Sequence, residues 1–186
     1  MQKVEARVEI IIGCMFSGKS SELLRRCKRY RSIGMQVLLV NSLHDTRCPA
    51  NSLKTHSDEI AACMKILHLC ELYSCDLFAE AQVIGVDEAQ FFTDLVEFVL
   101  ECEKLKKTVI IAGLDGDHRR KPFGQVLECI PLCDSVDKLE ALDMVSRDGS
   151  AAIFSKRLAK YEKVAGVHLI GAESVYVATN RENYLA

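Results

Sequence analysis

The sequence predicts an α/β fold in which helices flank a parallel β-sheet. Short apolar runs rich in Val and Ile alternate with segments of helical spacing along the first 142 residues, which is the order expected of parallel strands joined by crossover helices. In addition, residues 13–20 place two glycines, a lysine and a serine directly between the first apolar run and the first helical segment. Because α/β proteins bind phosphate at such a junction, this stretch predicts a site as well as a fold.

The individual elements follow from local patterns. Residues 8–12 read VEIII, a β-branched strand that ends at Gly13, and residues 19–33 are rich in Ser, Glu, Leu, Arg and Lys, which favours a helix that ends at Gly34. Further strands are predicted at residues 36–42, 82–87, 108–115 and 135–142. Further helices are predicted where apolar residues recur at helical spacing, at residues 60–72 and 92–107.

The last part of the chain has a different character. Residues 143–186 lose the alternation of strands and helices, so we expect an irregular appendage that carries short strands and folds over the core. The predicted organisation is therefore an α/β domain at residues 1–142 and a small lid domain at residues 143–186.

Composition restricts the partners and the compartment. The 186 residues carry 24 basic and 26 acidic side chains, a net charge of -2, which does not favour nucleic acid or an anionic membrane as a partner and indicates a small ligand. No apolar run reaches the length of about 18 residues that spans a bilayer. The nine cysteines lie mostly among apolar neighbours, and the chain opens without a signal-peptide pattern, so we expect reduced, buried thiols and a cytosolic protein.

The phosphate motif spans residues 13–20, GCMFSGKS. Its glycines, Gly13 and Gly18, let backbone amides turn toward phosphate oxygens, while Lys19 reaches the terminal phosphates and the Ser20 hydroxyl ligates Mg²⁺. The helix that begins near Lys19 adds the positive end of its dipole. The alternative, a glycine-rich turn without a ligand, is weakened by the strand before the motif and the helix after it. The predicted cofactors are ATP and Mg²⁺.

Two acidic residues follow the apolar run at residues 82–87. Asp87 at the strand end is the expected second contact for the metal ion. Glu88, the next residue, stands where a carboxylate can accept a proton from a nucleophile, which is water in an ATPase or a substrate hydroxyl in a kinase. A solvated acid at the start of a helix is the alternative for Glu88. These residues predict phosphate chemistry but do not choose the acceptor.

Five motifs occur in a family-specific order: GCMFSGKSSELLRRCKRY, DTR, GVDEAQFF, LDGDHRRKPFG and FSKRL. In this order and at these separations, from residue 8 to about residue 181, the chain resembles the thymidine kinase family of the P-loop type with a C-terminal lasso loop, type II. The resemblance implies transfer of the ATP γ-phosphate to the 5′-hydroxyl of thymidine, or of deoxyuridine, in pyrimidine deoxynucleotide salvage. It also implies a homo-oligomer, either a tetramer or a dimer.

The resemblance assigns roles residue by residue. The implied catalytic residues are the general base Glu88, Lys19 and Arg47. The implied ATP and metal contacts are Gly13, Met15, Phe16, Ser17, Gly18, Lys19, Ser20, Asp45 and Asp87, of which Ser20 and Asp87 would hold Mg²⁺. The implied nucleoside contacts are Met15, Phe91, Leu114, His118, Phe123, Ser155, Arg157 and Tyr176. Taken singly, Arg47 could be a surface residue, and Leu114 and Phe123 could be plain core. His118 stands where relatives usually carry an aromatic residue, so stacking on the base there would be weaker or use imidazole.

A second departure concerns zinc. The family usually holds its lasso domain with a structural zinc on paired cysteines or a cysteine and histidine, but the matching positions here are Asp143, Ser146, Asn180 and Asn183. This set lacks the soft ligands of a tetrahedral zinc site, which predicts a zinc-free lasso domain. The four polar side chains could bond one another, and a partner subunit or a flanking segment is an alternative support.

Three other functions are compatible with parts of the sequence. One is a kinase with a changed acceptor preference, because His118 and the altered appendage lie near the predicted pocket. Another is a catalytically silent half of a tandem or hetero-oligomeric kinase. The intact set of Lys19, Arg47, Ser20, Asp87 and Glu88 argues against it. The third is an ATPase that acts on nucleic acid, and the net charge of -2 and the absence of tryptophan give it little support.

Overall fold

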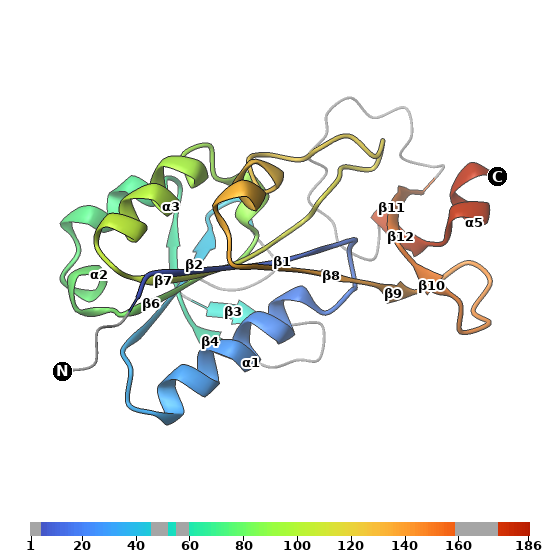
Figure 1. Ribbon diagram of the computed structural model, residues 1–186. Helices are drawn as coiled ribbons and strands as arrows, with labels where there is room; N and C mark the ends of the chain where they lie inside the picture. Colours follow the sequence, from blue (N-terminus) through green and yellow to red (C-terminus); the bar gives the residue numbers. More distant parts are fainter. Residues whose placement is uncertain (1–4, 46–51, 55–59, 159–174) are drawn as a thin grey trace.

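The computed structural model describes residues 5–45, 52–54, 60–158 and 175–186 (Figure 1). Its centre is a six-stranded sheet with the strand order β5-β2-β6-β7-β1-β8, in which every pair of neighbours is parallel. The strands are β1 (Arg7–Gly13), β2 (Val37–Ser42), β5 (Met64–Ile66), β6 (Val83–Val86), β7 (Thr108–Gly113) and β8 (Ser135–Leu139). The parallel α/β sheet predicted from the apolar runs is confirmed.

Helices and turns cover both faces of this sheet (Figure 1). On one face lie α1 (Lys19–Ser32) and the hairpin of β3 (Ser52–Lys54) and β4 (Ile60–Ala62), which bury a cluster around Leu23, Cys27 and Leu53. On the other face lie α2 (Asp76–Glu80), α3 (Leu95–Lys104), and the 3₁₀ turns η1 (Leu69–Ser74) and η3 (Leu127–Leu132). They bury a larger cluster around Phe92 and Phe98. The strands β1, β2, β6 and β7 therefore send alternate side chains into two separate cores.

The helix predicted at residues 60–72 is wrong. This window contains β4, then β5, and then the start of η1. The register pairs Met64 with Val40 of β2, and the amide of Leu43 donates to the carbonyl oxygen of Ile66 at 2.9 Å. The apolar spacing is real, because Leu69 and Leu72 are fully buried against the α3 face of the sheet. However, the open edge of the sheet offered backbone partners, and this pairing overrode the local helical pattern.

The C-terminal part consists of short strands, as predicted. Strand β9 (Ala141–Leu142) pairs with β10 (Ala151–Ala152), and β11 (Phe154–Arg157) pairs with β12 (Tyr176–Thr179), both antiparallel. The chain ends in the short helix α5 (Arg181–Leu185). The β9–β10 hairpin crosses the predicted boundary between residues 142 and 143, and the division into two domains stays a prediction.

Two further expectations concern cysteine and membranes. Five of the eight cysteines in the described ranges are buried, and burial raises the pKa of the Cys27, Cys102 and Cys129 thiols to about 12. These side chains therefore act as small core residues.

Among the described residues, no helix has the length and apolar character needed to cross a membrane.

Candidate active site

The phosphate motif forms the turn between β1 and α1. Gly13 has a φ of 147°, and a Cβ atom at this position would lie 2.3 Å from the carbonyl oxygen of Leu139 in β8, so only glycine fits. Phe16 and Gly18 have φ angles of 66° and 83°, and α1 begins directly after Gly18. Residues in left-handed geometry within a turn create the concave row of amides that binds anions. The turn thus has the form that the motif predicts, and Phe16 is in a conformation that is uncommon for a side-chain-bearing residue.

Lys19 bends back over this turn. Its Nζ atom donates to the carbonyl oxygen of Cys14 at 2.7 Å. Burial lowers the pKa of Lys19, although the carboxylates of Glu88 and Asp87 act in the opposite direction. The ammonium therefore lies in the electrostatic field of both strand-end acids.

The predicted metal ligands meet. The hydroxyl of Ser20 donates to Oδ1 of Asp87 at 3.0 Å, across 67 positions of sequence. Asp87 continues the parallel ladder after β6, because its amide donates to the carbonyl oxygen of Val40 at 2.9 Å. A hydroxyl and a carboxylate oxygen are the hard ligands that Mg²⁺ prefers, so the residues present fit this ion.

Glu88 is held in a special conformation. Its φ and ψ angles are 50° and 40°, left-handed geometry that costs free energy in a residue with a side chain and that is found most often at functional sites. Nε2 of Gln90 donates to Oε2 of Glu88 at 2.6 Å, while Oε1 of Gln90 accepts the amide of Leu114 at 3.0 Å. The backbone of Gln90 packs closely against Gly124, since a Cβ atom on Gly124 would lie 2.2 Å from the carbonyl oxygen of Gln90.

Gln90 is a site residue that sequence reasoning missed. It is 3% exposed and connects Glu88 at the end of β6 to Leu114 after β7. The only signal in the sequence was its place in the run DEAQFF, two positions after Glu88. The buried side-chain amide of Gln90 forms hydrogen bonds to groups that follow two different strands, and this fixes the orientation of the Glu88 carboxylate.

The DTR motif is described only in part. Asp45 is buried just after β2, where one of its carboxylate oxygens accepts from Nδ2 of Asn41 at 2.9 Å. It lies beyond the same end of the sheet as Asp87, because β2 and β6 are neighbours. Arg47, the predicted charge-neutralising residue, lies outside the described residues.

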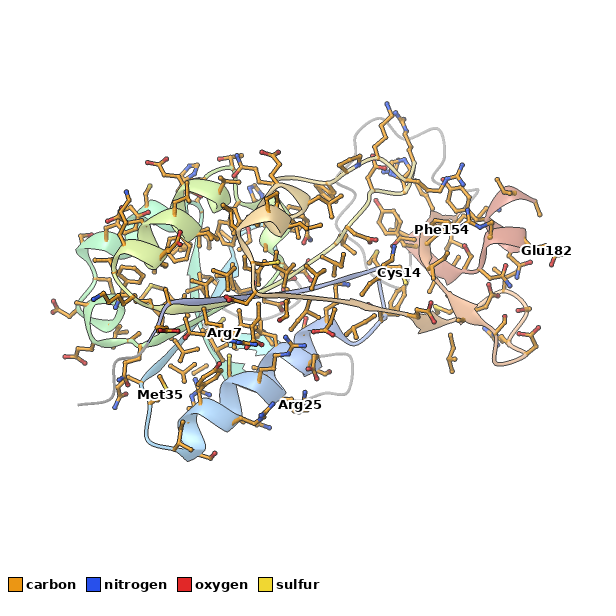
Figure 2. The ribbon with its side chains drawn as sticks, viewed as in Figure 1. Arg7, Cys14, Arg25, Met35, Phe154 and Glu182 are labelled. Atoms are coloured by element: carbon orange, nitrogen blue, oxygen red, sulfur yellow. The ribbon has the colours of Figure 1, made fainter. Side chains whose placement is uncertain are left out.

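Leu114, one of the residues predicted to contact the nucleoside, is bonded to Gln90, and the other seven fall into three groups. Phe91 and Phe123 pack edge to face with ring centroids 5.6 Å apart. The backbone amide of Met15 in the phosphate loop donates to the hydroxyl of Ser155 in β11 at 2.9 Å, which joins the C-terminal part to the loop. Figure 2 shows Cys14 and Phe154 at this junction.

The third group surrounds Tyr176. Nη2 of Arg157 donates to the hydroxyl of Tyr176 at 3.2 Å, and the rings of His118 and Tyr176 have centroids 6.3 Å apart. His118 and Arg157 line a cavity of about 270 Å³, whereas Ser155 lines another of about 340 Å³ with Cys14. Neither of these two cavities is lined by the Phe91–Phe123 pair. That these residues form a single nucleoside pocket stays a prediction.

Together these features define a P-loop α/β protein in which a hydrogen-bonded serine–aspartate pair and a strand-end glutamate lie beside the phosphate motif. The chain belongs to the thymidine kinase family: the family model described as thymidine kinase matches residues 6–184. Relatives span viruses, plants and animals. Thymidine kinase a of Arabidopsis thaliana is 41% identical and matches 96% of this chain and 74% of its own length. The cytosolic thymidine kinase of Gallus gallus is 40% identical (96% and 76%), and the Monkeypox virus thymidine kinase is 37% identical (96% and 96%).

Proposed function

We propose that this protein is a thymidine kinase that transfers the γ-phosphate of ATP to the 5′-hydroxyl of thymidine. Membership of the thymidine kinase family supports thymidine as the acceptor. The structural observation that carries the proposal is that Lys19, the Ser20–Asp87 pair and Glu88 lie close together beyond the carboxyl ends of the parallel strands. A phosphate cradle beside a carboxylate base is the arrangement that phosphoryl transfer requires.

ATP would bind at the turn between β1 and α1. The amides of the turn and the Lys19 ammonium would hold the phosphates, and the Ser17 hydroxyl braces the turn by donating to the carbonyl oxygen of Cys14 at 2.8 Å. Bound Mg²⁺ would supply charge neutralisation between the terminal phosphates. Ser20 and Asp87 are the residues that would hold it. The remaining proposed contacts of the donor are Gly13, Met15, Phe16, Gly18, Asp45 and Arg47.

Glu88 would act as the general base on the acceptor. As the 5′-oxygen forms its bond to the γ-phosphorus, the bond from phosphorus to the β,γ-bridging oxygen breaks and ADP leaves. The hydroxyl proton passes to the Glu88 carboxylate. Gln90 donates to one oxygen of that carboxylate, which fixes the orientation of the base and reduces the reorganisation needed during transfer.

The acceptor pocket would combine apolar and polar surfaces. The Phe91–Phe123 pair offers an aromatic surface of the kind that a flat pyrimidine packs against. Leu114, His118, Ser155, Arg157 and Tyr176 are the other proposed contacts. We propose deoxyuridine as a second acceptor. A homo-oligomeric state and a cytosolic location stay predictions from the sequence.

The function is tested with a panel of acceptors. Purified chain with Mg²⁺ and γ-labelled ATP is incubated with thymidine, deoxyuridine, deoxycytidine or no nucleoside, and labelled monophosphate is separated and counted. We expect thymidine to give the largest kcat/KM, deoxyuridine to be accepted, and label released without nucleoside to be negligible. Preference for deoxycytidine would establish a changed acceptor preference. ATP binding without any phosphorylated nucleoside would establish the silent-partner alternative.

His118→Phe is expected to keep or lower the KM for thymidine. Burial and the nearby Arg157 lower the pKa of His118, so the imidazole is neutral at pH 7 and contributes no charge to binding. A phenyl ring offers at least the same stacking surface. Steady-state kinetics at pH 7 and 8 measure the effect, with Arg119→Gln as the control for a change at the neighbouring exposed position. A markedly higher KM in His118→Phe would refute the alignment of this position with the family's aromatic residue.

A further inference from the structure

One buried carboxylate in the C-terminal part of the chain accepts five hydrogen bonds. Asp143 is 2% exposed. Its Oδ1 atom accepts the amides of Val145 (2.9 Å) and Ser146 (2.7 Å), the hydroxyl of Ser146 (2.9 Å) and Nδ2 of Asn183 (3.0 Å). Its Oδ2 atom accepts the amide of Asn180 at 2.5 Å. Five donors from residues up to 40 positions apart thus converge on one side chain.

The partners of Asp143 are themselves connected. Oδ1 of Asn180 accepts the amide of Asn183 at 2.8 Å and so caps α5, while Nδ2 of Asn180 donates to the hydroxyl of Ser150 at 3.3 Å. The backbone of Asp143 also participates, since its amide donates to the carbonyl oxygen of Ser150 at 2.8 Å. Burial alone would raise the pKa of Asp143, but the donors from Asn180, Ser146 and Asn183 outweigh burial and lower it below its ordinary value. The group is a carboxylate at neutral pH.

This network reaches the phosphate loop through β12 and β11. Asn180 directly follows β12, which pairs with β11 so that Ala178 lies opposite Ser155. Ser155 accepts the Met15 amide, and the thiol of Cys14 donates to the carbonyl oxygen of Ala152 at 3.3 Å. A small apolar cluster of Cys14, Ala152, Ala178 and Met144 fills the space between them. A shift of the end of β12 would therefore move Ser155 and Tyr176 relative to the loop.

The four linked side chains do not fit a zinc ion. Asp143, Ser146, Asn180 and Asn183 supply a single carboxylate among hydroxyl and amide groups, whereas structural zinc sites use thiolate and imidazole. Each of the four side chains makes at least one hydrogen bond to the side chain or the backbone of another member of the set. The bonds that a metal would otherwise make are thus replaced by hydrogen bonds centred on one charge, which are stronger than bonds between neutral groups.

We infer that Asp143 is a positioning residue, which joins the β9–β10 hairpin to β12 and α5 by hydrogen bonds in place of a metal ion and so sets β11 and β12 against the phosphate loop. Its effect on the acceptor rests on the proposed function, because Ser155 and Tyr176 are proposed contacts of the nucleoside. Its effect on the structure of β11 and β12 does not.

The test uses Asp143→Asn with Asp148→Asn as the matched control. In Asp143→Asn, one oxygen becomes an NH₂ group, and a donor then faces either the Asn180 amide or the donors at Oδ1. Asp148 lies on the same hairpin, and its bonds from the Ser146 hydroxyl and the Ser150 amide stay within that hairpin. The two variants lose the same charge, and only the first disrupts the link to β12.

Two readouts separate positioning from general stability. In Asp143→Asn we expect the KM for thymidine to rise by about tenfold and the KM for ATP to stay within about twofold of the parent value. The reason is that a charge-assisted hydrogen bond is replaced by two donors that face each other, and this change lies near the proposed nucleoside contacts Ser155 and Tyr176. Hydrogen exchange should accelerate at residues 154–157 and 176–179 but not in β1 or β7. Asp148→Asn should match the parent chain in both readouts.

Each outcome decides the inference. A folded Asp143→Asn with unchanged exchange in β11 and β12 overturns it, and so does one zinc per chain in elemental analysis of the parent protein. Altered exchange in a chain that phosphorylates no nucleoside would support the inference and reject the proposed function. If Asp143→Asn does not fold, Asn183→Ala takes its place, since it removes only the 3.0 Å bond to Asp143 and keeps the backbone bonds of residue 183 to Asn180 and Lys156. That variant should show the same changes at smaller size, and its failure to do so overturns the inference.

Discussion

Glu88→Gln is expected to lower kcat for thymidine phosphorylation by about 10²- to 10⁴-fold and to leave ATP affinity within about twofold. The amide has the shape of the carboxylate but cannot accept the proton of the 5′-hydroxyl. The local structure should survive, because the amide oxygen of the new side chain can still accept from Nε2 of Gln90, which is the donor in that bond. The change therefore isolates the chemistry from the fold.

The measurement combines initial rates with calorimetric titration of MgATP. Glu97→Gln, which removes an exposed acid from α3, is the control for loss of one negative charge and should retain the parent kcat. A Glu88→Gln variant with kcat within tenfold of the parent would assign the role of base to another group.

Lys19→Met is expected to weaken MgATP binding by at least about tenfold and to lower kcat by about 10²- to 10³-fold. This is the range found when one preorganised hydrogen-bond donor that stabilises the transition state is removed. The Lys19 ammonium lies over the phosphate turn, held by the carbonyl oxygen of Cys14, and ATP would bring phosphate charge to this place. Methionine keeps the length of the side chain without the charge. The fold should be retained, because burial of the ammonium disfavours its charged form and methionine removes that cost.

Lys104→Met serves as the control, since this lysine is exposed on α3 and its ion pair with Glu101 joins two neighbouring turns of one helix. Thermal unfolding of both variants shows whether the fold is intact. Lys19→Met with the parent affinity for MgATP would place the nucleotide phosphates elsewhere.

The turn at residues 13–20 was predictable because its sequence pattern is local. Glycines at residues 13 and 18, the lysine and the serine act through a turn of eight residues, and the strand and helix around that turn have strong patterns of their own. Asp87 and Glu88 were predictable for a related reason. A buried parallel strand is a nearly continuous apolar run, so the first acids after that run lie at the carboxyl end of the strand.

Other parts of the site depended on contacts between distant residues. Gln90 looked like any polar residue in a short turn, and its role appears only when Leu114 from the next strand comes within 3.0 Å of it. The window at residues 60–72 had helical spacing, yet the free edge of β2 drew Met64–Ile66 into the sheet. The absence of soft zinc ligands could be read from the sequence, but not that Asp143 would gather five donors in their place.

The fold class, the glycine-rich turn and the two acids after β6 could be predicted, since each of these rests on residues close together in the chain. Which polar side chains meet became clear from the three-dimensional fold: Ser20 bonds Asp87, Gln90 bonds Glu88, and Asp143 bonds Asn180 and Asn183. A hydrogen bond forms only when the distance between its two heavy atoms is correct to within a few tenths of an ångström and the donor points at the acceptor. Apolar periodicity in a sequence specifies only which face of a helix or strand is buried.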